Sequence, residues 1–223
     1  MTLLSPSLAR LEAPLVETLQ LMDDLGCESV HIDACHNLTL PNFFELEEVR
    51  TAQIGNYRAA ATVHIFQPIS NTPPILDFLR PIDLAVLHVF GRTAVSAVHS
   101  FLETNRVVGC RLGLAVDVKA NTESIAPFLA ELDTVFIMAI QVGGYGLEPD
   151  THLLKRVEQT RTLLTNHNPR CRIGIDGGVN GRTFSGMVRL ADELVIGSLL
   201  LHADDLVAQW MSLHEIAKGG KEK

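Results

Sequence analysis

The sequence predicts an α/β protein that folds as a single (β/α)8 TIM barrel. Short apolar runs of strand length alternate along the chain with longer stretches of helical periodicity. Such alternation is typical of parallel strands joined by helical crossovers. The alternation repeats eight times within 223 residues, which is close to the size of a compact barrel.

Most expected strands are nearly continuous in apolar residues, as is usual when both faces of a parallel sheet are buried. They are expected at Leu3–Leu8, Ser29–Ile32, Ala60–Ile65, Leu84–Val89, Leu112–Val116, Thr134–Met138, Arg172–Ile175 and Glu193–Ile196. Apolar residues three or four positions apart predict helices between them. These helices are expected at Leu11–Leu25, Phe43–Arg50, Ile75–Leu79, Ala94–Thr104, Ser124–Leu132, Thr151–Thr165, Gly181–Leu190 and Asp204–Ala217, the second being short and weakly patterned.

The composition indicates one soluble domain without a linker. Glycine and proline occur at expected turns, so we expect one domain over residues 1–218 and a frayed, charged tail over residues 219–223. The formal charge of −8 disfavours nucleic-acid binding. No run reaches the ~18 apolar residues of a membrane span. The four cysteines have no paired spacing, so we expect reduced thiols in a cytoplasmic protein.

Four residues with metal-binding side chains lie at expected strand ends. His31 and Asp33 are two positions apart and therefore face the same side of a strand, His64 ends the next strand, and Asp176 precedes Gly177-Gly178. Strand ends of a barrel meet on one rim. Two imidazoles and two carboxylates there suit one divalent ion (Zn²⁺, Fe²⁺, Mn²⁺ or Co²⁺) with open positions for substrate. Each residue alone could instead be a hydrogen-bonded strand-end or turn residue.

Glycine-containing loops follow the last three expected strands. Backbone amides in such loops can bind an anion, and barrels often bind phosphate after the seventh and eighth strands. A single glycine pair is weak evidence, because tight turns need glycine in any case. Together the three loops predict a phosphate site made by Gly144, Gly146, Gly177, Gly178, Gly197 and Ser198.

Through these residues and several further segments, the sequence resembles the ribulose-phosphate 3-epimerase family over nearly its whole length. The matching segments are Pro6-Ser7, His31–Asp33 through Pro41-Asn42, Val63-His64, His88, Met138, Ile175–Asn180 and Ala191–Ser198. The resemblance implies that His31, Asp33, His64 and Asp176 bind the metal and that the two aspartates exchange the proton. It also implies that Ser7 contacts substrate and that the protein is a homo-oligomer.

The sequence departs from the family pattern around the expected pocket. Ala34–Asn37 follows Asp33 where the family usually has Val-Met-Asp-Gly, and Phe66 replaces a pocket methionine. Asp117-Val118 replaces the usual Asn-Pro, and Val142–Gly146 has one glycine displaced relative to Pro-Gly-Phe-Gly-Gly. These departures leave the implied reaction unchanged and leave the particular ketose phosphate open.

The implied reaction inverts C3 of a ketose phosphate, such as ribulose 5-phosphate, xylulose 5-phosphate or a related pentulose or hexulose phosphate. A metal ion would stabilise the ene-diolate, and Asp33 and Asp176 would act as acid and base on opposite faces of the substrate. Met138 would limit the access of water.

Two alternatives stay open. One is another activity of phosphate-binding barrels, such as decarboxylation or aldol cleavage. It is disfavoured because the chain has no Asp-x-Lys-x-x-Asp run and no lysine at an expected strand end. The other is a sugar-phosphate-binding protein without catalysis, which is disfavoured because all four expected metal ligands are present.

Overall fold

The structure is a computed structural model that describes residues 1–8, 13–40, 42–67, 74–89, 95–144 and 146–219. In this part of the chain, nine parallel strands form one sheet in the order β1-β9-β8-β7-β6-β5-β4-β2-β3. They are β1 (Leu3–Pro6), β2 (Ser29–Cys35), β3 (Phe44–Glu45), β4 (Ala60–Phe66), β5 (Leu84–Val89), β6 (Arg111–Val116), β7 (Thr134–Met138), β8 (Arg172–Asp176) and β9 (Glu193–Ile196).

The sheet curls into a barrel that closes between β1 and β2. A parallel bridge joins Ser7 to His31, and the Leu8 amide donates to the His31 carbonyl at 2.9 Å. The remaining strand, β3, is a two-residue addition that pairs with Ala34 and Cys35 of β2. The predicted (β/α)8 barrel is therefore confirmed, with β3 as an unpredicted ninth strand.

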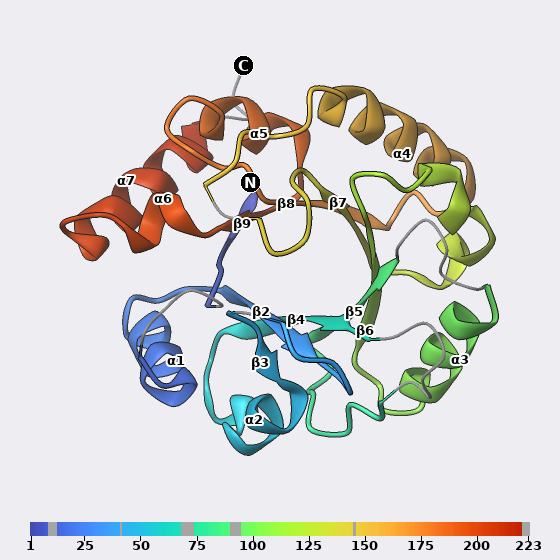
Figure 1. Ribbon diagram of the computed structural model, residues 1–223. Coiled ribbons are helices and arrows are strands. Elements are labelled where there is room, and N and C mark those ends of the chain that lie inside the picture. Colours follow the sequence, from blue (N-terminus) through green and yellow to red (C-terminus); the bar gives the residue numbers. More distant parts are fainter. Residues whose placement is uncertain (9–12, 41, 68–73, 90–94, 145, 220–223) are drawn as a thin grey trace.

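Helices surround the strands on the outside (Figure 1). They are α1 (Leu15–Asp24), α2 (Leu46–Thr51), η1 (Ile54–Asn56), α3 (Val95–Arg106), η2 (Thr122–Glu131), α4 (Leu153–His167), α5 (Phe184–Leu190), α6 (Ser198–Leu201) and α7 (Leu206–Gly219). The starts of two expected helices, at Leu11 and Ala94, lie outside the described residues. So does the expected tail, apart from Gly219, which ends α7.

Three of the expected helices differ in the structure. The segment Phe43–Arg50 is helical only from Leu46, because Phe44 and Glu45 pair with the end of β2 as strand β3. The segment Ile75–Leu79 is irregular, because Asn105 of α3 takes up its backbone groups: Asn105 Oδ1 accepts from the Leu76 amide, and Asn105 Nδ2 donates to the Pro74 carbonyl. The segment expected as an α-helix at Ser124–Leu132 is instead the 3₁₀ helix η2, which contains Pro127. Proline lacks the amide that an α-helix needs at that position.

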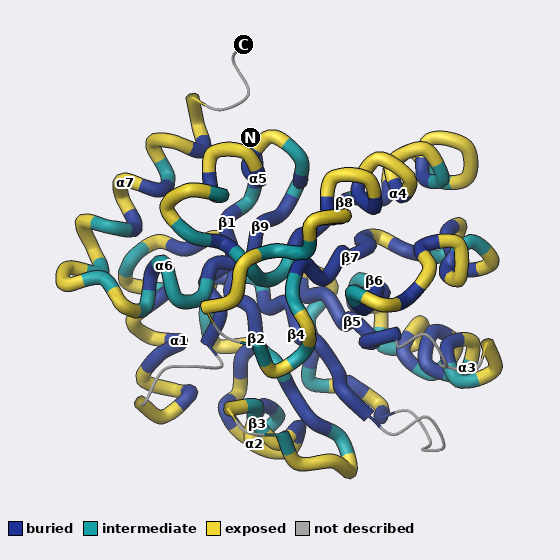
Figure 2. The backbone as a smooth tube through the Cα atoms, turned by 45° about the horizontal axis from the view of Figure 1, so that its top comes forward, coloured by how far each residue is buried: buried dark blue, intermediate teal, exposed yellow. Residues whose placement is uncertain are grey.

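Two apolar layers lie on the two faces of the curled sheet. Alternate residues of a strand face opposite sides, and on β5 Leu84 and Val86 pack in the barrel interior while Ala85 and Leu87 pack under the helices. The interior cluster consists of Leu84, Val86, Ala115, Phe136, Met138 and Val195. Figure 2 shows the strands buried and the exposed surface confined largely to outer helix faces and loops. This arrangement leaves the strand ends as the place where polar side chains can gather.

Two further expectations concern the cysteines and the membrane. Cys27, Cys35, Cys110 and Cys171 are all buried free thiols, as expected. Among the described residues, no helix combines the length and the apolar character that crossing a bilayer requires.

Candidate metal centre and substrate cavity

The carboxyl ends of β2, β4 and β8 bring His31, Asp33, His64 and Asp176 together. The ligand atoms of all four lie within 4.8 Å of one another. His31 Nε2 lies 3.2 Å from Asp33 Oδ1 and 3.7 Å from Asp176 Oδ2. His64 Nδ1 lies 3.7 Å from the same Asp176 oxygen. Strand register contributes directly, since His64 on β4 stands opposite Asp33 on β2.

The donor atoms fit a metal ion. His64 Nδ1 is buried and has no hydrogen-bond partner among the described residues, although two carboxylates lie nearby. A buried polar atom without a partner costs free energy unless a ligand satisfies it. Two imidazole nitrogens and two carboxylate oxygens are donors that divalent ions such as zinc or manganese accept. These four residues could therefore hold a metal ion.

Burial and the two carboxylates shift the pKa values of the cluster in different directions. Burial alone would lower the pKa of His31, but Asp33 and Asp176 raise it to about 9. Burial, followed by His31 and His88, holds the pKa of His64 well below its usual value. Burial raises the pKa of Asp176 to about 6, with His31 opposing this shift and Asp33 adding to it. Strongly shifted pKa values of this kind are typical of functional sites.

Phe136 supports the two histidines from inside the barrel. Its ring centroid lies 4.7 Å from that of His64 and 6.2 Å from that of His31, and the two imidazoles are themselves 4.2 Å apart. The side chain is fully buried. Opposite it, Gly174 is required, because a Cβ there would overlap the Phe136 ring.

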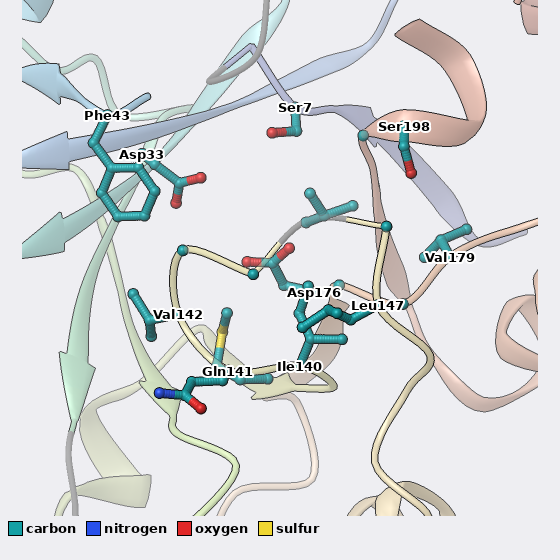
Figure 3. A pocket seen from close by; sticks show the side chains of 18 of the residues that line it. Ser7, Asp33, Phe43, Ile140, Gln141, Val142, Leu147, Asp176, Val179 and Ser198 are labelled. Atoms are coloured by element: carbon teal, nitrogen blue, oxygen red, sulfur yellow. The ribbon is translucent and has the colours of Figure 1, made fainter. Parts of the chain in front are cut away.

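A cavity opens above the cluster at the same rim. Its volume is about 110 Å³, and the carboxylates of Asp33 and Asp176 point into it (Figure 3). Every expected site residue except the two histidines lines it: Ser7, Asp33, Met138, Gly144, Gly146, Asp176, Gly177, Gly178, Gly197 and Ser198. His31 and His64 lie beneath it, completely buried.

The glycine loops are tightly packed against one another. Gly178 has a φ of +67°, and a Cβ there would lie 2.8 Å from Pro149 Cβ in the loop after β7. The same loop is tied to β8 by a hydrogen bond of 2.7 Å from the Ala139 amide to the Asp176 carbonyl. Glycine is needed at position 178 both for its backbone conformation and for the close approach. Residue 145 of this loop lies outside the described residues.

Sequence reasoning missed several residues around the cavity. Phe43 was expected in a helix, yet it lines the cavity beside Asp33. Arg156 of α4 is buried and donates to the Met138 and Asp117 carbonyls at 2.7 and 2.6 Å. His88, to which the sequence assigned no role beyond the family match, is buried, with Nε2 3.4 Å from Asp117 Oδ2. The replacement of the family's usual Asn-Pro by Asp117-Val118 was the one sequence signal that could have pointed to the His88–Asp117 pair.

Comparison with known proteins agrees with this geometry. The model of the ribulose-phosphate 3 epimerase family matches residues 3–201. The chain belongs to this family. Family membership and the relatives below assign the protein to the carbohydrate-phosphate epimerases.

Relatives within the ribulose-phosphate 3 epimerase family are distant. The ribulose-phosphate 3-epimerase of Aquifex aeolicus is 28% identical over 120 residues, which is 53% of this chain and 54% of that protein. The Methanocaldococcus jannaschii ribulose-phosphate 3-epimerase is 20% identical over 90% of this chain and 84% of its own length. The chain thus spans only about half of the first of these relatives.

Solved structures support the fold. The 3-hexulose-6-phosphate synthase of Salmonella typhimurium matches with a TM-score of 0.63 at 14% identity, covering 99% of this chain and 100% of that one. At this identity the match supports the (β/α)8 barrel alone.

Proposed function

We propose that the protein is a metal-dependent epimerase that inverts C3 of a ketose phosphate by proton transfer between two carboxylates. The substrate would be ribulose 5-phosphate, xylulose 5-phosphate or a related pentulose or hexulose phosphate. The observation that carries the proposal is the placement of Asp33 and Asp176, whose carboxylates enter one cavity from β2 and β8 above two buried histidines.

Inversion at carbon requires a base on one face of the substrate and an acid on the other. Asp33 and Asp176 come from strands on different sides of the cavity and can flank a bound molecule. The raised pKa of Asp176, about 6 in the metal-free site, suits a carboxyl group that carries a proton during turnover. One aspartate would remove the C3 proton while the other, protonated, would deliver a proton to the opposite face.

His31, Asp33, His64 and Asp176 would hold one divalent ion, Zn²⁺, Fe²⁺, Mn²⁺ or Co²⁺. When bound, such an ion supplies Lewis-acid stabilisation of the negative charge that develops on the substrate oxygens. The chain's own contribution is to exclude water, for which the apolar side chain of Met138, opposite Asp176 on the next strand, is well placed.

The phosphate would bind at the glycine end of the cavity. We expect backbone amides near Gly144, Gly146, Gly177, Gly178, Gly197 and Ser198 to donate to it. The Gly144 amide itself donates to the Gln141 carbonyl at 2.9 Å, so the donors of this loop would be its neighbours. Ser7 would contact the substrate from β1's end of the rim. We include in the same proposal that the protein acts in the cytoplasm as a homo-oligomer.

Proton NMR in D₂O tests this proposal directly. Metal-loaded protein is incubated with a panel of pentulose and hexulose phosphates, and the same protein treated with chelator serves as the control. We expect loss of the C3 proton signal and appearance of the C3 epimer for at least one sugar. Protein that binds one metal ion per chain and sugar phosphate, yet exchanges no C3 proton, would instead be a non-catalytic binding protein.

A further inference from the structure

An aromatic wall, made of Phe43 and Phe66, bounds the cavity on the side across from Ser198. The two ring centroids lie 4.7 Å apart, and both residues line the cavity with Asp33. Figure 3 shows Phe43 beside Asp33, across the cavity from Ser198. Phe66 is only 1% exposed, so the side chains packed behind it determine where its ring lies.

The side chain behind Phe66 is the His88 imidazole. The two rings are stacked, with centroids 4.7 Å apart and planes inclined by 29°. His88 Nε2 lies 3.4 Å from Asp117 Oδ2, and both residues are buried. A hydrogen bond at one ring nitrogen fixes the rotation of an imidazole. Asp117 therefore fixes the orientation of the His88 imidazole, against which the Phe66 ring stacks.

Asp117 is itself held firmly at the end of β6. Its Oδ1 accepts from the Lys119 amide at 3.0 Å, and its carbonyl accepts from Arg156 Nη2 at 2.6 Å. The hydrogen bond from His88 lowers the pKa of Asp117; burial opposes this, while the Lys119 amide and the Arg156 charge add to it. The carboxylate is therefore a fixed, charged acceptor for the imidazole.

We propose that Asp117 is a positioning residue for substrate binding: through His88 it holds the Phe66 ring, and the aromatic wall packs against the end of the ketose phosphate remote from the phosphate. The nature of this ligand rests on the proposed function. A wall that contacts substrate and transition state alike contributes uniform binding, so loosening it raises KM and leaves kcat nearly unchanged.

Kinetics of Asp117→Ala and Asp117→Asn test the proposal, with the sugar that wild type epimerises fastest. For Asp117→Ala we expect KM to rise about fivefold, the effect of one lost hydrogen bond, with kcat within about twofold of wild type. Asp117→Asn keeps one oxygen that accepts from the Lys119 amide, and its NH2 group can donate to Nε2 of neutral His88, so the hydrogen bond to the imidazole is kept and KM should stay close to that of wild type. An unchanged KM in Asp117→Ala, or a fall in kcat alone, overturns the proposal.

Asp133→Ala is the matched control. Asp133 Oδ2 also accepts a hydrogen bond from a backbone amide, that of Leu112, at 2.9 Å. This bond lies at the amino end of β6 and β7, whereas Asp117 lies at the carboxyl end of β6. Its loss should lower the denaturation midpoint while KM stays unchanged. A KM change equal to that of Asp117→Ala would show that any weakening of β6 and β7 suffices, and would also overturn the proposal.

Phe66→Leu completes a double-mutant cycle. If Asp117 acts through the Phe66 ring, Asp117→Ala should raise KM much less in the Phe66→Leu background than in wild type. Additive effects would mean that Asp117 acts by another route. If Asp117→Ala does not fold, His88→Leu is compared with Phe66→Leu in the same cycle, because it also removes the link to Asp117.

Crystal structures separate this proposal from the proposed function. In Asp117→Ala the His88 and Phe66 rings should be displaced or adopt more than one conformation, while His31 and Asp33 stay in place. Wild-type protein that epimerises no sugar would refute the proposed function, and a Phe66 ring unmoved by Asp117→Ala would refute the positioning role, whatever the activity.

Discussion

Two histidines of the same cluster differ in how readily they take up a proton. His31 lies between two carboxylates and has a pKa raised to about 9, whereas burial and neighbouring imidazoles hold the pKa of His64 far below its usual value. A metal ion accepts only the neutral imidazole. His31 must therefore lose its proton before it can act as a ligand, and His64 need not.

Metal binding is expected to release a proton at neutral pH. Below pH 9 His31 of the metal-free protein is protonated, so the metal displaces about one proton at pH 7.5 and its affinity rises as the pH rises toward 9. Below pH 6 the carboxyl group of Asp176 must also lose a proton, so affinity should fall more steeply. Titration calorimetry in two buffers of different ionisation enthalpy measures the release. Equal heats in both buffers would contradict the prediction.

Asp33→Asn and Asp176→Asn separate proton exchange from inversion. Each variant keeps an oxygen near the metal but loses the group that carries a proton on one face. With saturating metal, epimerisation should fall by ~10²–10⁴-fold, as for loss of a general acid or base. The remaining carboxylate can still exchange the C3 hydrogen with solvent, so exchange seen by NMR should outlast inversion. Near-normal epimerisation in both variants would exclude the two-carboxylate mechanism.

The sequence predicted the cluster because its members were expected at strand ends, and strand ends of a barrel share a rim. In the structure β2 continues to Cys35, so His31 lies within the strand, with its side chain on the same side as that of Asp33. His31, Asp33, His64 and Asp176 needed no knowledge of side-chain packing. Arg156 could not be found in this way. It lies within α4, where an arginine is usually solvent-exposed, and only the tertiary fold reveals that it caps the ends of β6 and β7.

At the scale of elements, the end of the cavity where we propose that phosphate binds depends on two loops that pack closely against each other. The loop after β8 carries Gly177 and Gly178, and Pro149 of the loop after β7 lies against Gly178. Neither loop can move toward the other without overlap. The position of the expected phosphate site is therefore a property of the pair of loops.

Gly178→Ala should disturb this pair. The new Cβ would overlap Pro149, and the positive φ would cost about 1–2 kcal/mol for a residue with a side chain. We expect a higher KM for the phosphorylated sugar together with a lower free energy of unfolding, measured by steady-state kinetics and urea denaturation. Gly181→Ala is the control, since a Cβ there meets no atom within 4 Å. An unchanged KM in Gly178→Ala would place the phosphate elsewhere.

Sequence periodicity predicted most helices of the structure but could not predict the exceptions. Irregular backbone at Ile75–Leu79 is stabilised by Asn105, which lies about thirty residues further along the chain. β3 forms because Phe44 and Glu45 meet the end of β2, which is a tertiary contact. The signal for η2 was present in Pro127, whose effect on an α-helix is local. The sequence thus indicates local effects such as that of a proline, but it does not predict hydrogen bonds between residues far apart in the chain.

For the whole molecule, the small core inside the barrel also supports the candidate metal centre. Phe136 fills the interior and contacts the His64 ring, so packing and ligand geometry depend on the same side chain. The larger core, between the sheet and the helices, contains other buried aromatic residues such as Phe128, which lies on η2.

Phe136→Ala should therefore weaken both stability and metal binding. Removal of a buried phenylalanine costs about 3–5 kcal/mol of unfolding free energy, and the cavity left behind would free the His64 ring to move. Urea denaturation and metal titration measure the two effects. Phe128→Ala, in the outer core, should lose comparable stability while metal affinity stays near wild type. Equal losses of affinity in both variants would show that general destabilisation, not support of His64, is responsible.

The seam between β1 and β2 is closed, among the described residues, by the Ser7–His31 bridge and the hydrogen bond from the Leu8 amide to the His31 carbonyl. The cluster spans this seam, because His31 and Asp33 lie on β2 while Asp176 lies on β8, beyond β1 and β9. A bound ion would therefore connect the two sides of this seam, and we expect it to reduce local opening there. Deuterium uptake at Leu8 should slow on metal addition, while uptake along the β5–β6 ladder stays constant.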